Sequence, residues 1–172
     1  VAKADSVVDA AMLEHCVRED LNETAIRRMA VLDPVLVEIE NWDEGKVEEI
    51  ELENHPNHPE LGTRKVKLGK HVYIEREDFA EVPPSKFFRL KPEGEVRLKS
   101  AYIIKCMRWE KDAEGNITKI ICSYDPTSHS GEESRKVKGT LHWVNADDAT
   151  KAEFRLYDTL MKSESAAADE AE

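Results

Sequence analysis

Two kinds of hydrophobic pattern divide the chain. Near its start, apolar residues recur every three or four positions across residues 7–19, which is typical of one face of a helix, and Asp5 or Ser6 can cap the first turn. Residues 20–22 include Asp and Asn and are expected to end this helix, and residues 24–29 can add one short helical turn. The pattern therefore predicts one substantial helix at this end of the chain.

From Ala30 onward, apolar and polar residues alternate with a period of two, which indicates strands. Gly, Pro, Asp and Asn gather in the joints between the alternating runs, where turns need them. Many short strands at close spacing predict a mainly β protein, a sandwich or a barrel. The predicted strands cover residues 31–41, 46–53, 64–68, 70–75, 87–91, 95–99, 101–109, 117–124, 137–143 and 152–158.

For one predicted hairpin, the position of the loop also predicts which residues of the two strands pair. The strands at 101–109 and 117–124 flank a turn, and symmetric pairing about Glu114 places Cys106 opposite Cys122. That face is otherwise apolar and aromatic, so we interpret the two thiols as buried packing residues, with a cross-strand disulfide as the lesser alternative. The other residues on this face are Tyr102, Ile104, Ile120 and Tyr124.

Composition limits the location and the partners of the protein. Hydrophobic residues make up 40% of the chain, and no apolar run approaches the ~20 residues that cross a bilayer, so no membrane partner is expected. The first residues lack the pattern of a signal peptide. Three cysteines without metal-ligand spacing suggest reduced thiols, which indicates a cytoplasmic protein.

The charge is distributed unevenly. A net charge of −11 argues against non-specific binding of nucleic acids. Residues 38–53 hold eight acidic residues and one basic residue, whereas residues 64–110 hold twelve basic and seven acidic residues. A locally basic middle within an acidic chain predicts a patch for an anionic partner.

Sequence motifs for catalysis are missing. The sequence has no glycine-rich phosphate loop, no G-x-S-x-G motif and no HExxH motif. His55 and His58 lie three positions apart, but each is followed by a proline and no second ligand pair comes after them. We therefore predict no catalytic residue and no metal site.

Basic and aromatic residues in the predicted strands are better candidates for a site. Strict alternation places Phe87 and Arg89 outside, with Phe88 and Leu90 facing inward. An exposed aromatic ring beside an arginine suits an unpaired RNA base, which stacks on the ring or on the guanidinium plane. The same alternation places two further cations together on an outer face, Arg97 and Lys99.

Seven segments resemble one known family in the same order along the chain. They are REDLNETAIRRMAVLDPV, NHPNHPELGTRKV, YIEREDF, FFRL with GEVRLKSAYIIK, KDAEGNIT, KVKGTLHWV and EFRLYDTLM. Together they resemble glutaminyl-tRNA synthetase of the bacterial and eukaryotic type, over about residues 8–161. Any single segment is a weak signal, but the ordered series is specific.

The resemblance implies a mainly β fold: an antiparallel β-barrel, similar to that of a ribosomal protein, preceded by an N-terminal α-helix. It assigns residues 1–29 to a helix connecting from the catalytic part, residues 30–161 to the proximal anticodon-binding barrel, and residues 162–172 to a disordered acidic tail. The sequence has no HIGH-like or KMSKS-like motif, which handle ATP in class I synthetases. The chain alone is therefore predicted to be inactive and to need no cofactor.

The resemblance also implies what surrounds this domain. The parent enzyme ligates glutamine to its tRNA with ATP and Mg²⁺, and its catalytic and distal barrel domains would be partners within one chain. The anticodon stem-loop of the tRNA would be the RNA partner. In the family a last strand returns from the distal barrel; without it, we expect an open barrel edge that can pair with a second copy of this chain.

The resemblance assigns roles position by position. Arg27 matches an arginine that contacts an anticodon base, Arg89 matches the residue that reads the third base, and Arg97 and Lys99 match the pair beside the first base. Phe88 stands where a lysine is common, and Lys99 replaces an arginine, so it lacks the bidentate fork. The predicted anticodon-binding set is completed by Asn22, Asn57 and Lys86.

Arg28 has no matched role, and we leave it open between a phosphate contact and a plain surface charge. Two alternatives to the main interpretation also remain. One is the related glutamyl-tRNA synthetase, and the other is a protein-interaction barrel with little affinity for RNA. The salt dependence of binding distinguishes the protein-interaction barrel from an RNA-binding domain, since RNA contacts release counterions and weaken as salt rises.

Overall fold

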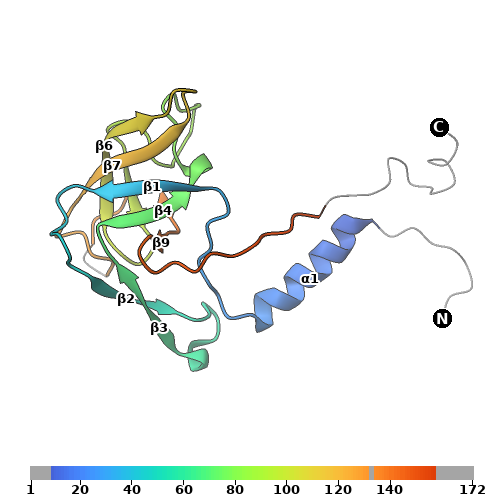
Figure 1. Ribbon diagram of the computed structural model, residues 1–172. Helices are drawn as coiled ribbons and strands as arrows, with labels where there is room; N and C mark the ends of the chain where they lie inside the picture. Colours follow the sequence, from blue (N-terminus) through green and yellow to red (C-terminus); the bar gives the residue numbers. More distant parts are fainter. Residues whose placement is uncertain (1–8, 132–133, 158–172) are drawn as a thin grey trace, which may run out of the picture. The chain divides into compact units, whose positions relative to one another are not determined.

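The computed structural model describes residues 9–131 and 134–157, which divide into two compact units (Figure 1). Residues 27–151 form the larger unit. The smaller unit holds the described residues before Arg27 and those after Lys151. The domain bounds of the sequence analysis stay a prediction, and the expected tail at 162–172 lies outside the described residues.

The smaller unit contains one α-helix, α1 (Ala10–Thr24). Asp9 caps it, because its side chain accepts a hydrogen bond from the Ala11 N–H at 3.0 Å. The predicted end at residues 20–22 is wrong, since the helix continues through them and closes with a bond from the Ala25 N–H to the Leu21 carbonyl. Asp and Asn cost less than about 1 kcal/mol each in a helix, which is too little to break it.

Two further predictions, a helical turn after α1 and a last strand near residue 152, are also wrong. Residues 25–29 form no helical turn, and residues 152–157 form no strand. The alternation of apolar residues in this last segment is real in the sequence, but an alternating pattern alone does not supply a neighbouring strand to pair with.

Among its described residues, the larger unit has nine strands in two sheets. A curled seven-stranded sheet has the order β8-β5-β6-β7-β1-β4-β9, and β2 (Glu48–Glu53) and β3 (Thr63–Leu68) form a separate ribbon (Figure 1). The strands of the large sheet are β1 (Pro34–Ile39), β4 (His71–Glu75), β5 (Glu95–Leu98), β6 (Ile103–Lys111), β7 (Ile117–Tyr124), β8 (Thr140–Leu141) and β9 (Val144–Asn145).

The mainly β prediction is confirmed, with a sheet that is mixed instead of wholly antiparallel. β1 lies parallel to β7, and β5 lies parallel to β8. Both parallel pairs join strands separated by long stretches of chain, as parallel pairing requires. Two short 3₁₀-helices, η1 (Pro59–Leu61) and η2 (Arg76–Asp78), complete the regular structure of the described residues.

The predicted strand at 87–91 is absent. Lys86 has a φ of 63°, so the chain turns there, and Leu90 forms only an isolated bridge with Phe79. Because the segment is not a strand, its side chains do not alternate as predicted. Phe88 is 52% exposed instead of facing inward, whereas Leu90 is buried as expected.

The predicted β6–β7 hairpin is confirmed. Cys106 pairs with Cys122, and both thiols are free and buried. The register shifts by one residue after Cys106 and shifts back near Lys111, so the symmetric pairing about Glu114 holds at both ends of the hairpin but not in the middle. Bulges of this kind add twist to a curled sheet.

One short segment closes the curled sheet. β8 and β9, the two edge strands, are separated by only His142 and Trp143, so residues 140–145 reach both edges. We call residues 140–145 the closing segment. Trp143 is fully buried, and its indole Nε1 donates to the Lys99 carbonyl at 3.1 Å. Neither edge of this sheet therefore offers a long unpaired strand of the kind expected from the resemblance.

The closing segment enters the sheet through Gly139, and this close approach gives a testable prediction. A Cβ atom on Gly139 would lie 2.0 Å from the Phe88 carbonyl oxygen. We expect Gly139→Ala to lower the free energy of unfolding by about 1–3 kcal/mol, the cost of overpacking, in urea unfolding followed by fluorescence. Gly131→Ala is the control, since nothing lies within 4 Å of its added Cβ. Equal stability of the two variants would contradict the prediction.

Candidate functional site

The larger unit contains a hollow of about 620 Å³ whose walls are rich in cations. The segment before β1, the β2–β3 ribbon, the turn after β5 and the loop at 129–131 all contribute to it. We call it the basic cavity. Its charged lining residues are Arg27, Arg28, Arg64 and Lys99, opposed by Glu51 and Glu53, and its other lining residues are Met29, Leu52, Pro56, Ser100, His129, Ser130 and Gly131.

Backbone hydrogen bonds fix the walls of the basic cavity. The Arg27 N–H donates to the Asn54 carbonyl at 2.7 Å, which ties the segment before β1 to the end of β2. Lys99 is held twice by the closing segment: its N–H donates to the Leu141 carbonyl at 2.8 Å, and its carbonyl accepts from Trp143. The cationic side chains therefore project from a fixed frame.

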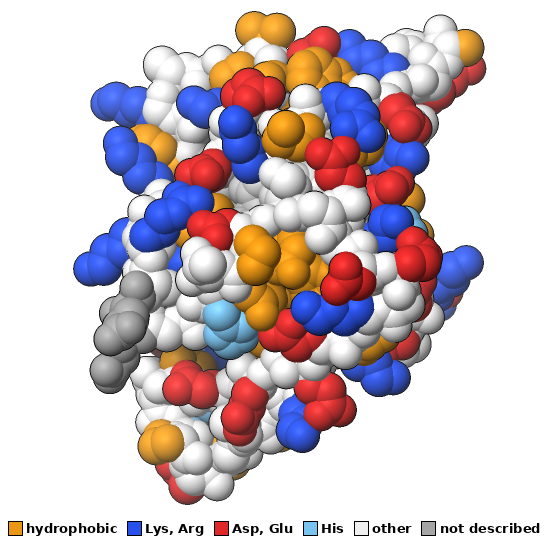
Figure 2. All heavy atoms as spheres, turned by 90° about the vertical axis from the view of Figure 1, so that its left-hand side faces the viewer, with side chains coloured by type: hydrophobic (Ala, Val, Ile, Leu, Met, Phe, Trp, Pro, Cys, Tyr) orange, Lys and Arg blue, Asp and Glu red, His pale blue; other side chains and the backbone are white. Residues whose placement is uncertain are grey.

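Among the described residues, three cations of the basic cavity lack the carboxylate partners that many other basic residues of this protein have. In the described part of the chain, Arg28, Arg64 and Lys99 form no ion pair with a carboxylate. Elsewhere, basic and acidic side chains are interspersed, as Figure 2 shows for one face. The residues with ion pairs include Lys65, Lys67, Lys70, Arg76, Arg89, Lys105, Arg108, Lys111, Lys119 and Arg135.

Arg97 does not line the basic cavity but supports it. Its guanidinium donates to the carbonyls of Ala101 at 3.0 Å, Ser128 at 2.6 Å and Arg135 at 2.7 Å. Ser128 directly precedes the loop residues that line the cavity. The predicted alternation is confirmed, since Val96 and Leu98 are buried while Arg97 and Lys99 lie on the other face. The two cations differ in their contacts, because the half-buried Arg97 is bound to the protein's own backbone whereas Lys99 is exposed. Arg97 acts as a positioning residue for the loop at 128–131.

Arg89 and Lys86 also lie outside the lining of the basic cavity. Arg89 Nη1 contacts Glu77 at 2.8 Å, and its Nε lies 3.3 Å from Asp78. The bond to Glu77 raises the pKa of Arg89. Burial raises the pKa of the Asp78 carboxyl, and the charge of Arg89 opposes that rise. Next to Arg89 in the sequence, Phe88 forms a cation–π contact, with the Lys138 ammonium 5.3 Å from the ring centroid.

Neither predicted asparagine is among the lining residues of the basic cavity. Asn57 is exposed in the loop that contains η1, next to the cavity residue Pro56, and its N–H donates to His55 Nδ1 at 3.1 Å. Asn22 is exposed on α1 in the smaller unit. The predicted set is thus only partly brought together, with Arg27, Arg28 and Lys99 lining one hollow.

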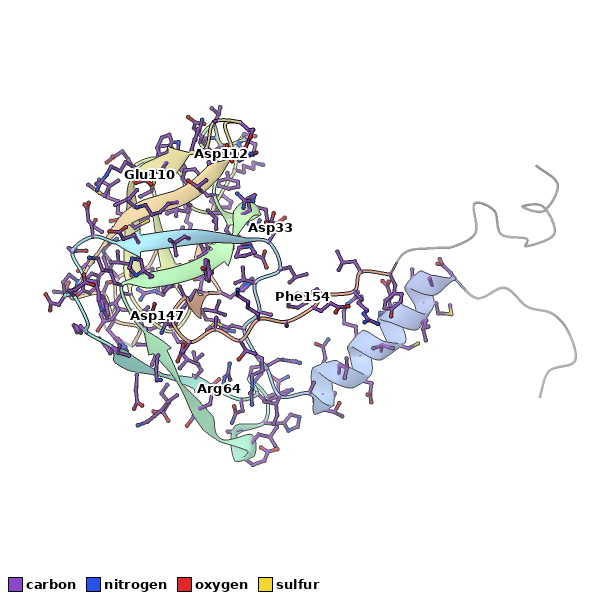
Figure 3. The ribbon with its side chains drawn as sticks, in the orientation of Figure 1. Asp33, Arg64, Glu110, Asp112, Asp147 and Phe154 are labelled. Carbon is purple, nitrogen blue, oxygen red and sulfur yellow. The ribbon has the colours of Figure 1, made fainter. Side chains whose placement is uncertain are left out.

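Among the lining residues of the basic cavity that the sequence analysis did not name as site residues are one arginine and one histidine. Arg64 extends from β3 (Figure 3), and His129 lies in the loop after β7. The basic run at 64–67 is visible in the sequence, but only the structure separates Arg64 from Lys65 and Lys67, whose charges are paired with Glu49 and Asp148. No comparable signal in the sequence marks His129.

The described residues contain no group of three or more His, Cys, Asp or Glu side chains arranged to hold a metal ion. Within the same residues, no helix has both the length and the apolar character needed to cross a membrane. The guanidinium and ammonium groups that line the basic cavity are donors suited to binding anions.

Two family models match this chain, and together they cover most of the larger unit. Residues 25–125 match the family model for the anticodon-binding domain of class I tRNA synthetases (E and Q), and residues 140–171 match a second model with the same description. The chain is similar to proteins named glutamine–tRNA ligase: 52% identical in Bradyrhizobium diazoefficiens, 55% in Clostridium perfringens and 51% in Alteromonas mediterranea. These alignments cover 96%, 94% and 99% of this chain but only 30%, 30% and 31% of the relatives.

The Arg89–Asp78 contact predicts a pH-dependent loss of stability. Replacing Arg89 with alanine leaves the buried Asp78 without its cation, so the pKa of Asp78 should rise further. A carboxyl whose pKa is higher in the folded than in the unfolded state stabilises the folded state at acid pH. This stabilisation is lost as the pH rises and the carboxyl ionises. Arg89→Ala should therefore cost about 1–2 kcal/mol at neutral pH, given the partial exposure of Arg89, and the cost should shrink at acid pH, as the pH falls through the raised pKa of Asp78.

Urea unfolding at both pH values tests this expectation. Arg108→Ala is a matched control, because Arg108 is also paired with a glutamate, Glu40, but that pair is more exposed to solvent. We expect the control to change stability by less than about 1 kcal/mol at either pH. A loss of stability in Arg89→Ala that is the same at both pH values would show that the buried carboxylate is not its cause.

Proposed function

Because this chain belongs to the family of anticodon-binding domains of class I tRNA synthetases for glutamate and glutamine, we propose that it binds the anticodon stem-loop of a glutamine tRNA. The basic cavity is the centre of that surface, with Arg27 and Lys99 facing the RNA. Arg89, Lys86, Asn57 and Asn22 are further members of the proposed contact set. The reaction step itself belongs to another part of the parent protein.

One observation carries the proposal more than any other. The protein has a net charge of −11, yet three cations that line one hollow have no carboxylate partner among the described residues. Unpaired cations on adjacent walls of a cavity repel one another, and an anionic ligand removes that repulsion. A local cationic patch on an acidic protein can bind RNA at one place. The negative charge of the rest of the protein prevents the non-specific binding of nucleic acids that a basic protein shows.

The parent protein is proposed to ligate glutamine to its tRNA with ATP and Mg²⁺, since the relatives are named glutamine–tRNA ligase. This chain spans about 30% of their length, and we propose that the catalytic and distal barrel domains act as its partners within the parent chain. A cytoplasmic location stays a prediction. Purified chain should show no ATP-dependent charging of tRNA, and detectable charging would contradict this assignment.

The names of the relatives favour glutamine over glutamate as the amino acid of the parent enzyme. The protein-interaction alternative draws on the acidic β2 strand, whose Glu49 and Glu51 are exposed. The ribbon neutralises part of this charge itself, because Lys65 pairs with Glu49. A ligand whose affinity is insensitive to salt would support a protein partner, whereas steep salt dependence supports RNA.

Binding of anticodon stem-loops at low salt tests the proposed function. A glutamine tRNA stem-loop should bind, a change of the third anticodon base should weaken binding by ~1–3 kcal/mol, and Arg89→Ala should remove that preference. Arg108→Ala serves as the matched control, with the preference unchanged. Equal and weak binding of stem-loops with the native, first-base-changed and third-base-changed anticodons would show that this chain does not read bases by itself.

We also propose a dimer formed through an edge strand, with the β2–β3 ribbon as the pairing element. The edges of the large sheet are β8 and β9, with two residues each, so the β2–β3 ribbon offers the longer free edges among the described residues. Pairing β2 of one copy with β3 of another places acidic against basic side chains. Sedimentation should then give a mass that rises with concentration. The mass of a single chain at every concentration would rule this dimer out.

A further inference from the structure

Two arginines converge on one neutral acceptor at the wall of the basic cavity. Arg28 Nη1 lies 3.3 Å from Asn54 Oδ1, and Arg64 Nη1 lies 3.4 Å from the same oxygen. Each Nη1 also donates to a backbone carbonyl, that of Arg27 at 3.0 Å and that of Glu53 at 2.8 Å. The two guanidinium groups come from segments far apart in the sequence, and Asn54 brings them together.

Asn54 is held rigidly enough to fix this arrangement. Its side-chain amide Nδ2 donates to the Leu61 carbonyl at 3.0 Å, and its backbone N–H donates to the Gly62 carbonyl at 3.0 Å. Its own carbonyl accepts the Arg27 N–H. The acceptor therefore cannot move to serve one arginine at the expense of the other, and both guanidinium groups stay near it.

The pair is left with unbalanced charge. Burial lowers the pKa of Arg64, and the nearby charge of Arg28 lowers it further. Neither arginine forms an ion pair with a carboxylate of the described residues, although Glu51, which accepts a hydrogen bond from the Thr63 hydroxyl, and Glu53 line the same cavity. Two like charges that share a neutral amide repel each other, so an anion between them would be strongly favoured.

Hydrogen-bond donors for such an anion are in place. A guanidinium has five N–H groups, and the bonds of Arg28 and Arg64 to described residues all use Nη1. The Nε and Nη2 groups of both therefore keep their donors for a ligand. Two guanidinium forks suit the tetrahedral oxygens of a phosphate better than a single lysine does.

We propose that Arg28 and Arg64 form a phosphate subsite that takes one phosphodiester group of the bound RNA. The proposal rests on the proposed function and gives Arg28 a role, with Arg64 as its partner. Both arginines also line a second hollow of about 300 Å³ beside the basic cavity, so the phosphate lies where the two meet. Contacts to phosphate fix the register of the RNA and carry no base preference.

The first arm of the test measures RNA binding over a range of salt concentrations. Arg28→Ala should reduce the slope of log affinity against log salt by about 0.7–0.9, the value for one lost phosphate contact, and leave the preference for the third anticodon base unchanged. Arg28→Lys keeps the positive charge without the bidentate guanidinium, so its salt slope should lie between those of the wild type and Arg28→Ala. Arg108→Ala removes the same charge outside both hollows and should leave the slope unchanged.

The second arm uses inorganic phosphate alone, with chloride keeping the ionic strength constant. The side-chain Nε–H signals of Arg28 and Arg64 should shift together in NMR spectra and saturate, and Arg28→Ala should abolish the shift of Arg64. Thermal unfolding of each variant confirms that it is folded. A purely structural role of Arg64 at the end of the ribbon would change thermal stability but neither the salt slope nor the response to phosphate.

The two arms separate the possible failures. An unchanged salt slope in Arg28→Ala, with wild-type RNA binding intact, would overturn the subsite while leaving the proposed function in place. Phosphate binding at the pair without any binding of stem-loops would instead refute the proposed function, and with it the assignment of the phosphate to RNA. No coupled response to phosphate would overturn the paired site itself.

Discussion

The closing segment at residues 140–145 is the constraint on which the rest of the larger unit depends. It bonds to β5 at one edge of the curled sheet and to β4 at the other, with only two residues between the two strands. Trp143 is one of these two residues and is fully buried. Burying an aromatic side chain of this size contributes several kcal/mol, which is comparable to the net stability of a small domain.

The same segment also determines where the functional cations stand. Leu141 and Trp143 hold the backbone of Lys99 from two sides, and Arg97 fixes the loop at 128–131 through three carbonyl groups. The opposite wall depends on Asn54, which joins the segment before β1 to the β2–β3 ribbon. A cavity whose cations repel one another needs such a frame, because otherwise the side chains would relax away from each other.

Charge in this protein is controlled by pairing more than by composition. The basic residues of β3 show this clearly, since Lys65 and Lys67 alternate with the side chains of Arg64 and Val66 along one strand. Lys65 and Lys67 form ion pairs with Glu49 and Asp148, whereas Arg64 lines the basic cavity and, among the described residues, donates hydrogen bonds to an amide oxygen and a backbone carbonyl. An acidic protein can therefore present a cationic surface of limited size.

The sequence by itself determined the local features: the mainly β class, most strands, the hairpin in which Cys106 faces Cys122, and the family to which the chain belongs. Periodicity and turn residues are local properties, so they can be recognised without a structure. Only the tertiary structure decided which cations are free of carboxylates, that Arg97 binds backbone, and that Arg89 is paired with Glu77 and Asp78. Each of these depends on residues distant in sequence, and alternation along one strand cannot say which neighbours a side chain will meet.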